Sequence, residues 1–168
     1  MGHDEYLEDI YGKLRKTRSL LEEIKRMSSS TAPTFSDVLM REKQRAQRYN
    51  HYFSVVLLTP DEVDALDLLK RTTRLLRGSD VVGLVDAQGR YHRAAELGQG
   101  IHSAPRDAPG ERWPSVGVVL PETDRQGAQR AVLRLESVLL DAARVKIGLA
   151  VYPEDGTDPD ELIQRAAA

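Results

Sequence analysis

The sequence predicts an α+β fold of the ferredoxin-like βαββαβ type, with an antiparallel sheet and two helices on one face, preceded by a coiled-coil helix. Two observations lead to this prediction. Apolar runs long enough for buried strands alternate with longer segments that have the charge pattern and apolar spacing of helices. Along the chain these segments are ordered as strand, helix, two strands, helix and strand, and one further helix follows.

The first residues of the chain carry a heptad pattern. Between residues 4 and 27 the a and d positions, interrupted by Thr17, hold Leu7, Ile10, Leu14, Leu21 and Ile24. The stripe is narrow and has no second apolar face, so we favour a short coiled coil pairing two chains over a helix packed on its own domain. A seam this short is marginal alone, so the predicted homodimer would need contacts elsewhere as well.

Domain boundaries follow from a change in composition. The small-residue, proline-containing stretch SSSTAPT interrupts the helical pattern and indicates a linker. We therefore assign residues 1–28 to the coiled-coil helix, residues 29–34 to the linker and residues 35–168 to one domain.

The domain begins with a predicted basic, amphipathic helix over residues 35–49, for which Ser36 or Asp37 is the candidate N-cap. The apolar runs predict strands over residues 52–59, 81–86, 115–120 and 144–152. Helices are predicted over residues 60–77, 124–143 and 159–168. The first of these three begins at Pro60 and ends before Gly78, in the positions that these residue types favour.

An insertion of about residues 87–111 separates the second and third strands. It is polar, rich in glycine and proline, and too long for an ordinary connection. Its two histidines, His92 and His102, are a weak metal signal in a chain without cysteine. A flexible loop or small extra hairpin is one interpretation, and a partner-binding arm or a lid is the other.

Composition excludes several classes of function. The formal net charge of −2 produces no field that would draw the chain onto nucleic acid or an anionic membrane. The absence of cysteine excludes disulfides and thiol catalysis and fits a reducing compartment. No apolar run approaches the ~20 residues of a membrane helix. We therefore expect a cytoplasmic protein without nucleic-acid binding or membrane insertion.

Three stretches of the domain resemble a known family. LLRGSDVVGLV (residues 75–85), VGVVLPETD (116–124) and IGLAVYPEDGTDPDELIQRA (147–166) look like the second half of a GGDEF domain, the diguanylate cyclase family. The resemblance covers roughly residues 35–168 and is strongest in the last stretch. It implies the same ferredoxin-like fold.

The resemblance also implies that the catalytic signature is lost. Counting back from VVLPET, the positions of the Gly-Gly-Asp-Glu-Phe turn hold Arg112, Trp113, Pro114, Ser115 and Val116. The family uses the glycines to approach the nucleotide and a carboxylate to hold Mg²⁺, and this segment offers neither. The first strand ends in Thr59 where the family has a metal-binding aspartate, and the family's guanine-binding segment looks shortened. We expect no cyclase activity, no catalytic residues, no metal and no cofactor.

One binding motif of the family is retained. Arg77 and Asp80 match the Arg-x-x-Asp pattern of its inhibitory site, which binds cyclic di-GMP, and Arg74 is a possible further contact. A guanidinium can fork onto guanine or phosphate, and a carboxylate can accept from guanine N–H groups. A helix-end arginine followed by an ordinary turn explains the same residues. The leading hypothesis is therefore an inactive cyclic di-GMP receptor that signals as a dimer, and the alternative is a nucleotide-independent interaction scaffold.

Overall fold

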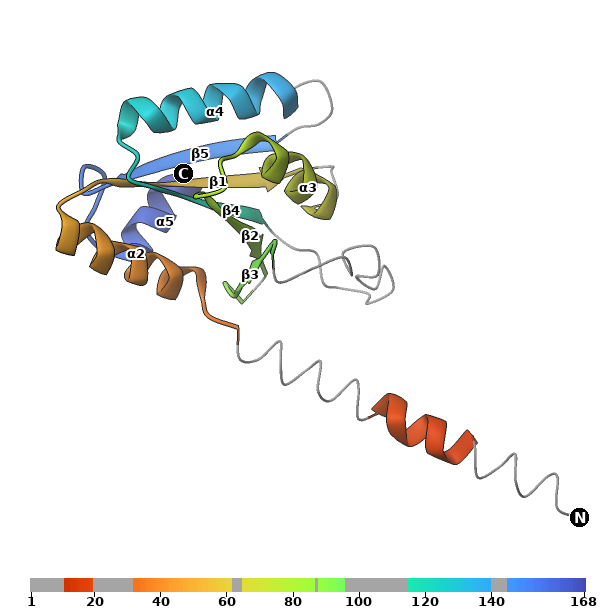
Figure 1. The fold of residues 1–168 in the computed structure, drawn as a ribbon. Coiled ribbons are helices and arrows are strands. Elements are labelled where there is room, and N and C mark those ends of the chain that lie inside the picture. The colour runs from red at the N-terminus through yellow and green to blue at the C-terminus, as the bar shows by residue number, and fades with distance from the viewer. Residues whose placement is uncertain (1–10, 20–31, 62–64, 87, 96–114, 140–144) are drawn as a thin grey trace, which may run out of the picture. The chain divides into compact units, whose positions relative to one another are not determined.

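The computed structural model describes residues 11–19, 32–61, 65–86, 88–95, 115–139 and 145–168 (Figure 1). Contacts divide the chain into two compact units, Met1–Ala32 and Pro33–Ala168. No helix among the described residues is long and apolar enough to cross a membrane.

In the first unit, residues 11–19 are helical and exposed, inside the predicted helix of residues 4–27. Leu14 of the predicted seam is 59% exposed in the single chain, as an unpaired coiled-coil position should be. The other seam residues lie outside the described part of the chain: Leu7, Ile10, Leu21 and Ile24. The coiled coil therefore stays a prediction.

The second unit is built on a five-stranded sheet. Its strands are β1 (Phe53–Pro60), β2 (Val81–Val85), β3 (Tyr91–Arg93), β4 (Ser115–Pro121) and β5 (Val145–Tyr152). The order across the sheet is β3-β2-β4-β1-β5, and every strand pairing among the described residues is antiparallel. Without the short edge strand β3, this is the strand order of a ferredoxin-like fold, which confirms the predicted fold class.

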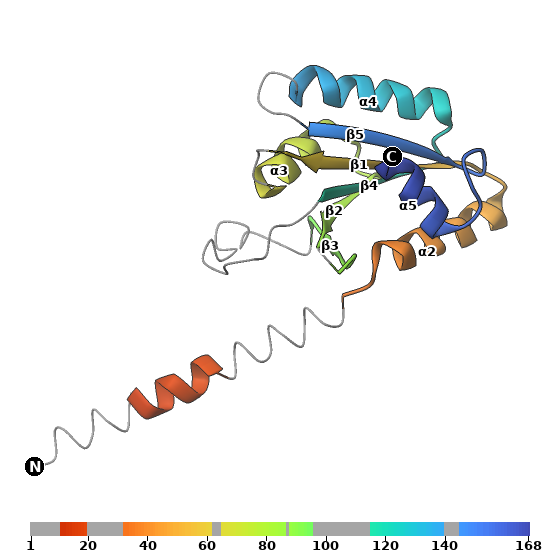
Figure 2. The ribbon, with the colours of Figure 1, turned by 180° about the vertical axis from the view of Figure 1, so that it is seen from behind.

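Helices cover both faces of the sheet. One face carries α3 (Ala65–Leu75) and α4 (Arg125–Leu139), and the opposite face carries α2 (Phe35–Tyr49) and α5 (Pro159–Ala167), as Figures 1 and 2 show from two sides. The prediction of two helices on one face describes only α3 and α4. The helices at the two ends of the domain complete the second layer.

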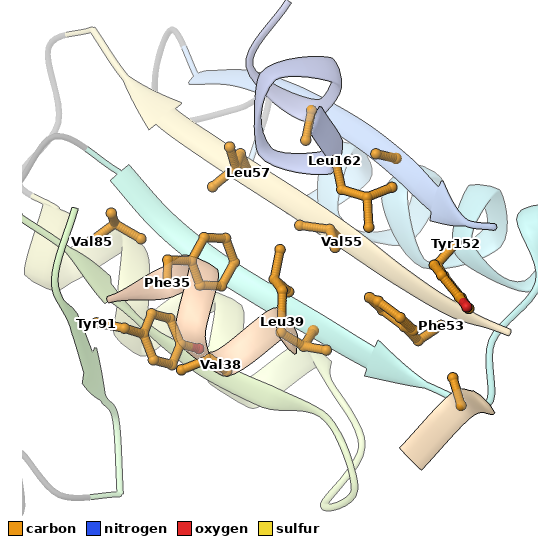
Figure 3. Packing of buried hydrophobic residues seen from close by; sticks show 14 residues of the cluster. Phe35, Val38, Leu39, Phe53, Val55, Leu57, Val85, Tyr91, Tyr152 and Leu162 are labelled. Atoms are coloured by element: carbon orange, nitrogen blue, oxygen red, sulfur yellow. The ribbon is translucent and has the colours of Figure 1, made fainter. Parts of the chain in front are cut away.

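Alternation along the central strand divides the core between these layers. Phe53, Val55 and Leu57 of β1 pack under α2 and α5 (Figure 3). Val56 and Leu58 pack under α3 and α4. Each of these side chains is 6% exposed or less. Burying one of them fully contributes about 1.5–3 kcal/mol, so both faces of β1 hold the domain together.

The start of α2 and the end of β1 differ from the predictions. Thr34, not Ser36 or Asp37, is the N-cap of α2: its Oγ1 accepts from the Asp37 N–H at 3.1 Å, and the Asp37 carboxylate accepts from the Thr34 N–H at 3.0 Å. Pro60 ends β1 opposite Val145 instead of starting a helix. Proline is tolerated there because the pairing of β1 with β4 already ends at Leu58.

Candidate functional site

The Arg-x-x-Asp segment forms a closed turn. Helix α3 ends at Leu75, so Arg77 lies in the following loop and not at a helix terminus as predicted. The Asp80 Oδ2 atom accepts from the Arg77 backbone N–H at 2.8 Å, and the Asp80 N–H donates to the Arg77 carbonyl at 3.0 Å. One carboxylate oxygen thus holds the turn, while the exposed Arg77 side chain extends from it. The helix-dipole explanation of Arg77 is therefore removed, and the turn explanation of Asp80 is strengthened.

A cavity of about 630 Å³ adjoins this turn, at the end of the sheet where β1 and β2 begin and β4 ends. It combines cations and anions: its lining includes Arg77, Arg130, Arg134, Asp80, Glu122 and Asp124. The volume lies within the range typical of sites for small ligands. Such a mixture suits a ligand that carries both phosphates and hydrogen-bond donors, more than it suits a simple polyanion.

Two hydrogen bonds between side chains and the main chain hold the loop after β4 in place. Ser54 Oγ of β1 donates to the Thr123 carbonyl at 2.8 Å, which ties the loop to the sheet. Asp124 Oδ1 accepts from the Gly127 N–H at 2.8 Å and caps the start of α4. The cap directs α4 so that Arg130 and Arg134, four residues apart and both exposed, line the cavity together.

The structure therefore brings Arg77 and Asp80 to one cavity and adds two arginines that the sequence interpretation missed. Arg74, on α3, is exposed and does not line this cavity. The sequence could have predicted that Arg130 and Arg134 share one helix face, since they lie four residues apart on a predicted helix. Their proximity to Arg77 depends on strand pairing and is not visible in the sequence.

The opposite end of the sheet holds the described residues that the family resemblance assigns to the catalytic turn. Ser115 and Val116 lie in β4, opposite Val85 and Leu84 of β2. The other three residues assigned to the signature position lie outside the described residues: Arg112, Trp113 and Pro114. The described start of the insertion, residues 88–95, forms a turn and the edge strand β3, as the small extra hairpin among the alternatives would.

Asp86 organises that hairpin. Its Oδ1 accepts from the backbone N–H groups of Gln88 and Arg90 at 3.0 and 2.9 Å, and its Oδ2 lies 3.1 Å from His92 Nε2. Burial alone would raise the pKa of the Asp86 carboxyl, but the hydrogen bonds from His92, Arg90 and Gln88 outweigh burial and lower this pKa. The Asp86 carboxylate thus accepts its hydrogen bonds within the turn and stays charged.

Strand β3 is fastened to the domain through Tyr91. Its ring stacks on Phe35 with centroids 4.9 Å apart, and its hydroxyl donates to the Gly117 carbonyl at 3.0 Å. Gly83 leaves room for this ring, because a Cβ there would lie 2.7 Å from the Tyr91 Cζ. The Tyr91 N–H donates to the Pro33 carbonyl at 2.7 Å, so the hairpin also holds the segment that leads into α2.

Several solved structures have a similar fold. The GGDEF domain of YfiN (TpbB) from Pseudomonas aeruginosa matches with a TM-score of 0.57 and 17% identity, over 82% of this chain and 86% of that one. A sensory box/GGDEF family protein from Caulobacter crescentus matches with a TM-score of 0.53 and 14% identity, over 79% and 85% of the two chains. A DGC protein from Thermotoga maritima matches with a TM-score of 0.50 and 15% identity, over 82% and 95%.

The chain has the fold of a GGDEF domain. No protein-family model matches the sequence, and a search of curated proteins gave no match either. At these identities the structural likeness establishes the GGDEF-like fold alone. Activity and ligand binding must be argued from the residues.

The stretch with the strongest sequence resemblance has a structural role in this GGDEF-like fold. In the turn after β5, Asp155 accepts from the Val151 N–H at 2.8 Å and returns a backbone hydrogen bond of 2.8 Å to the Val151 carbonyl. Arg125, at the start of α4, contacts Glu154 and Asp155, each at 2.7 Å. The hydrogen bond to Glu154, and to a lesser extent the one to Asp155, raises the pKa of the Arg125 guanidinium. The motif joins α4 to the end of β5.

Carboxylates and histidines are dispersed over the GGDEF-like domain. Among the residues that the structure describes, no group of three or more His, Asp and Glu could hold a metal ion. Thr59 at the end of β1 and Ser115 at the start of β4 offer hydroxyls where the family resemblance would place carboxylates. The described carboxylates at this end of the sheet include Asp86, which accepts hydrogen bonds within its own hairpin turn, and Asp160, which lines a pocket together with Thr59 and Ser115.

Proposed function

We propose that this chain is a catalytically inactive GGDEF-like domain that binds cyclic di-GMP in the cavity beside Arg77. The observation that carries the proposal is the convergence of three arginines with the Arg-x-x-Asp turn on one cavity: Arg77, Arg130 and Arg134. Two of them come from α4, far along the chain from the motif. A turn retained only for folding gives no reason for this convergence.

Each group in the cavity has a matching partner on the ligand. Guanidinium groups donate paired hydrogen bonds to phosphate oxygens or to the O6 and N7 atoms of guanine. Asp80 uses Oδ2 in its turn, so its Oδ1 is the oxygen that can accept from guanine N1–H or N2–H. Glu122, which also lines the cavity, is a second acceptor. A phosphate-only ligand would leave these carboxylates facing like charge.

Absence of cyclase activity is part of the proposal. It is supported by Thr59 and Ser115 in place of metal-binding carboxylates and by the role of Asp86 in its own hairpin turn. Thr59 and Ser115 provide no carboxylate for the Mg²⁺ of bound GTP, and the Asp86 carboxylate already accepts hydrogen bonds within its own turn. GTP with Mg²⁺ should therefore give no product, and detection of cyclic di-GMP by chromatography would contradict this part of the proposal.

Calorimetric titration with cyclic di-GMP tests the binding proposal. Arg77→Ala and Arg134→Ala should each weaken binding by about 10- to 150-fold, as expected for loss of hydrogen bonds to a charged group. Arg165→Ala is the matched control, because Arg165 is an exposed arginine on α5 and does not line the cavity. An absence of heat at high micromolar ligand, or equal affinity for all four proteins, would contradict the proposal.

Dimerisation is the proposed route by which binding is signalled. We propose that residues 4–27 pair two chains, in keeping with the 59% exposure of Leu14 on the helix of residues 11–19. Light scattering during size exclusion should show a dimer for the wild type and a monomer for Leu14→Arg. A dimer in both would place the interface elsewhere.

A nucleotide-independent scaffold is the second candidate, and two exposed apolar side chains favour it. Leu133 and Val138 on α4 are 63% and 45% exposed, which is a high exposure for apolar side chains on an otherwise charged helix. The insertion of residues 87–111 is the other proposed contact for a protein partner. Partner capture that is unaffected by Arg77→Ala, but lost on Leu133→Ser or on replacement of residues 96–111 by a short Gly-Ser linker, would favour the scaffold.

A further inference from the structure

One wall of the arginine-containing cavity is aromatic. Tyr52 lies immediately before β1, lines the cavity and is 46% exposed. Alternation along β1 places Ser54, Val56 and Leu58 on the face that α3 and α4 cover, so Tyr52 lies on the same side. That is the side from which α4 contributes Arg130 and Arg134 to the same cavity.

The surroundings of Tyr52 suit a flat, partly apolar group. Leu120 and Ala131, which are 2% and 6% exposed, also line the cavity beside the charged residues. A purine base has one apolar face on each side and polar groups only at its edge, and it therefore matches a cavity lined by an aromatic ring, apolar side chains and charges.

We propose that Tyr52 stacks on a purine base of the bound nucleotide. This inference rests on the proposed function and assigns separate tasks within the cavity. Tyr52 binds the face of the base, Arg77 and Asp80 contact its edge, and Arg130 and Arg134 contact phosphate. Because every base has a π-face, Tyr52 contributes affinity for purines in general, while selection of guanine depends on the edge contacts.

The experiment is a set of titrations with cyclic di-GMP and cyclic di-AMP on wild type and three variants. Tyr52→Leu removes the aromatic face and should weaken cyclic di-GMP binding by about 5- to 150-fold, the range of one base–aromatic stack. Tyr52→Phe keeps the face and should stay within about twofold of wild type. Tyr49→Leu is the control: Tyr49 is 64% exposed, stacks on His51 and does not line the cavity.

Two further readouts separate stacking from a structural role. Ligand should quench the emission of the wild type and of Tyr52→Trp more than that of Tyr52→Leu, because a stacked base quenches the ring that it covers. The ratio of affinities for the two dinucleotides should be unchanged in Tyr52→Leu and reduced in Arg77→Ala.

The outcomes distinguish this inference from the function on which it rests. If wild type binds no cyclic di-GMP, the proposed function and the stacking role are both wrong. If wild type binds and Arg77→Ala weakens binding while Tyr52→Leu leaves it unchanged, only the stacking role is wrong. Equal losses in Tyr52→Leu and Tyr52→Phe would also overturn stacking and indicate a role for the hydroxyl instead.

Discussion

Replacement of Tyr91 tests whether the hairpin formed by β2 and β3 belongs to the folded core. Tyr91 is 1% exposed, stacks on Phe35 and donates a 3.0 Å hydrogen bond to the Gly117 carbonyl. Tyr91→Phe removes the hydroxyl alone, and Tyr91→Ala removes the ring as well. The pair therefore separates the hydrogen bond from the packing.

The structure sets the size of both effects. Loss of one buried hydrogen bond should lower the free energy of unfolding by about 1 kcal/mol. Loss of the ring should lower it by about 3–5 kcal/mol, because Gly83 beside the ring has no side chain that could fill the cavity. Domains of this kind are stable by about 5–15 kcal/mol, so Tyr91→Ala should remove a large part of the total.

Urea unfolding at pH 7, followed by circular dichroism, measures these differences. Tyr49→Phe and Tyr49→Ala are the matched controls, since Tyr49 is 64% exposed, and they should stay within about 0.5 kcal/mol of wild type. A change below about 0.5 kcal/mol for Tyr91→Ala would refute the reasoning. The hairpin would then be an appended loop that unfolds without consequence for the sheet.

Substitutions at three further positions test local features of the fold. Arg125→Gln removes both contacts to the turn after β5 and should lower the free energy of unfolding by about 0.5–1 kcal/mol, a small value because Arg125 is 39% exposed. The loss of stability should be smaller in 1 M salt, and an unchanged loss there would argue against charge as its cause. Asp86→Asn should lower the free energy of unfolding at pH 7. Because folding lowers the pKa of Asp86, the difference in unfolding free energy between wild type and variant should decrease as the pH falls below the ordinary aspartate pKa of about 3.9. A difference that stays constant to lower pH would contradict this. Asn50 is the C-cap of α2 and has a φ of 52°, in the left-handed region. Asn50→Val should therefore lower the free energy of unfolding in urea by about 1–2 kcal/mol, and Asn50→Gly should leave it almost unchanged. Equal losses for the two variants would exclude backbone strain as the cause.

Apolar runs and helical spacing of apolar residues predicted most of the fold. The run from residue 52 to 59 predicted β1 to within one residue at each end, because a central strand buried on both faces is apolar throughout. The second helical layer was missed because α2 and α5 belong to the two ends of the domain, and nothing local shows that they meet the same face. Strand β3 was covered only by the alternative of a small extra hairpin, because three residues within a polar segment have no periodicity to detect.

The candidate site was predictable only in part. The Arg77–Asp80 pattern was visible because its residues are contiguous in sequence. The other half of the cavity comes from the loop and helix after β4, and the antiparallel pairing of β4 with β2 brings these residues beside Arg77. The end of α3 was misplaced by two residues, since Gly78 resembles a helix stop whether the helix ends at residue 75 or 77.

Sequence resemblance and chemical function have to be weighed separately in this domain. The best-matching stretch, around Glu154 and Asp155, consists of residues whose hydrogen bonds and ion pairs are all internal to the fold. Asp80 is partly of the same kind, because its Oδ2 closes the turn that starts at Arg77. Selection for folding alone can therefore keep the aspartate of the motif. It does not by itself bring the exposed Arg77 to the same cavity as two exposed arginines of α4. Arg77, Arg130 and Arg134, more than Asp80, are the residues whose substitution decides whether this GGDEF-like domain binds a ligand.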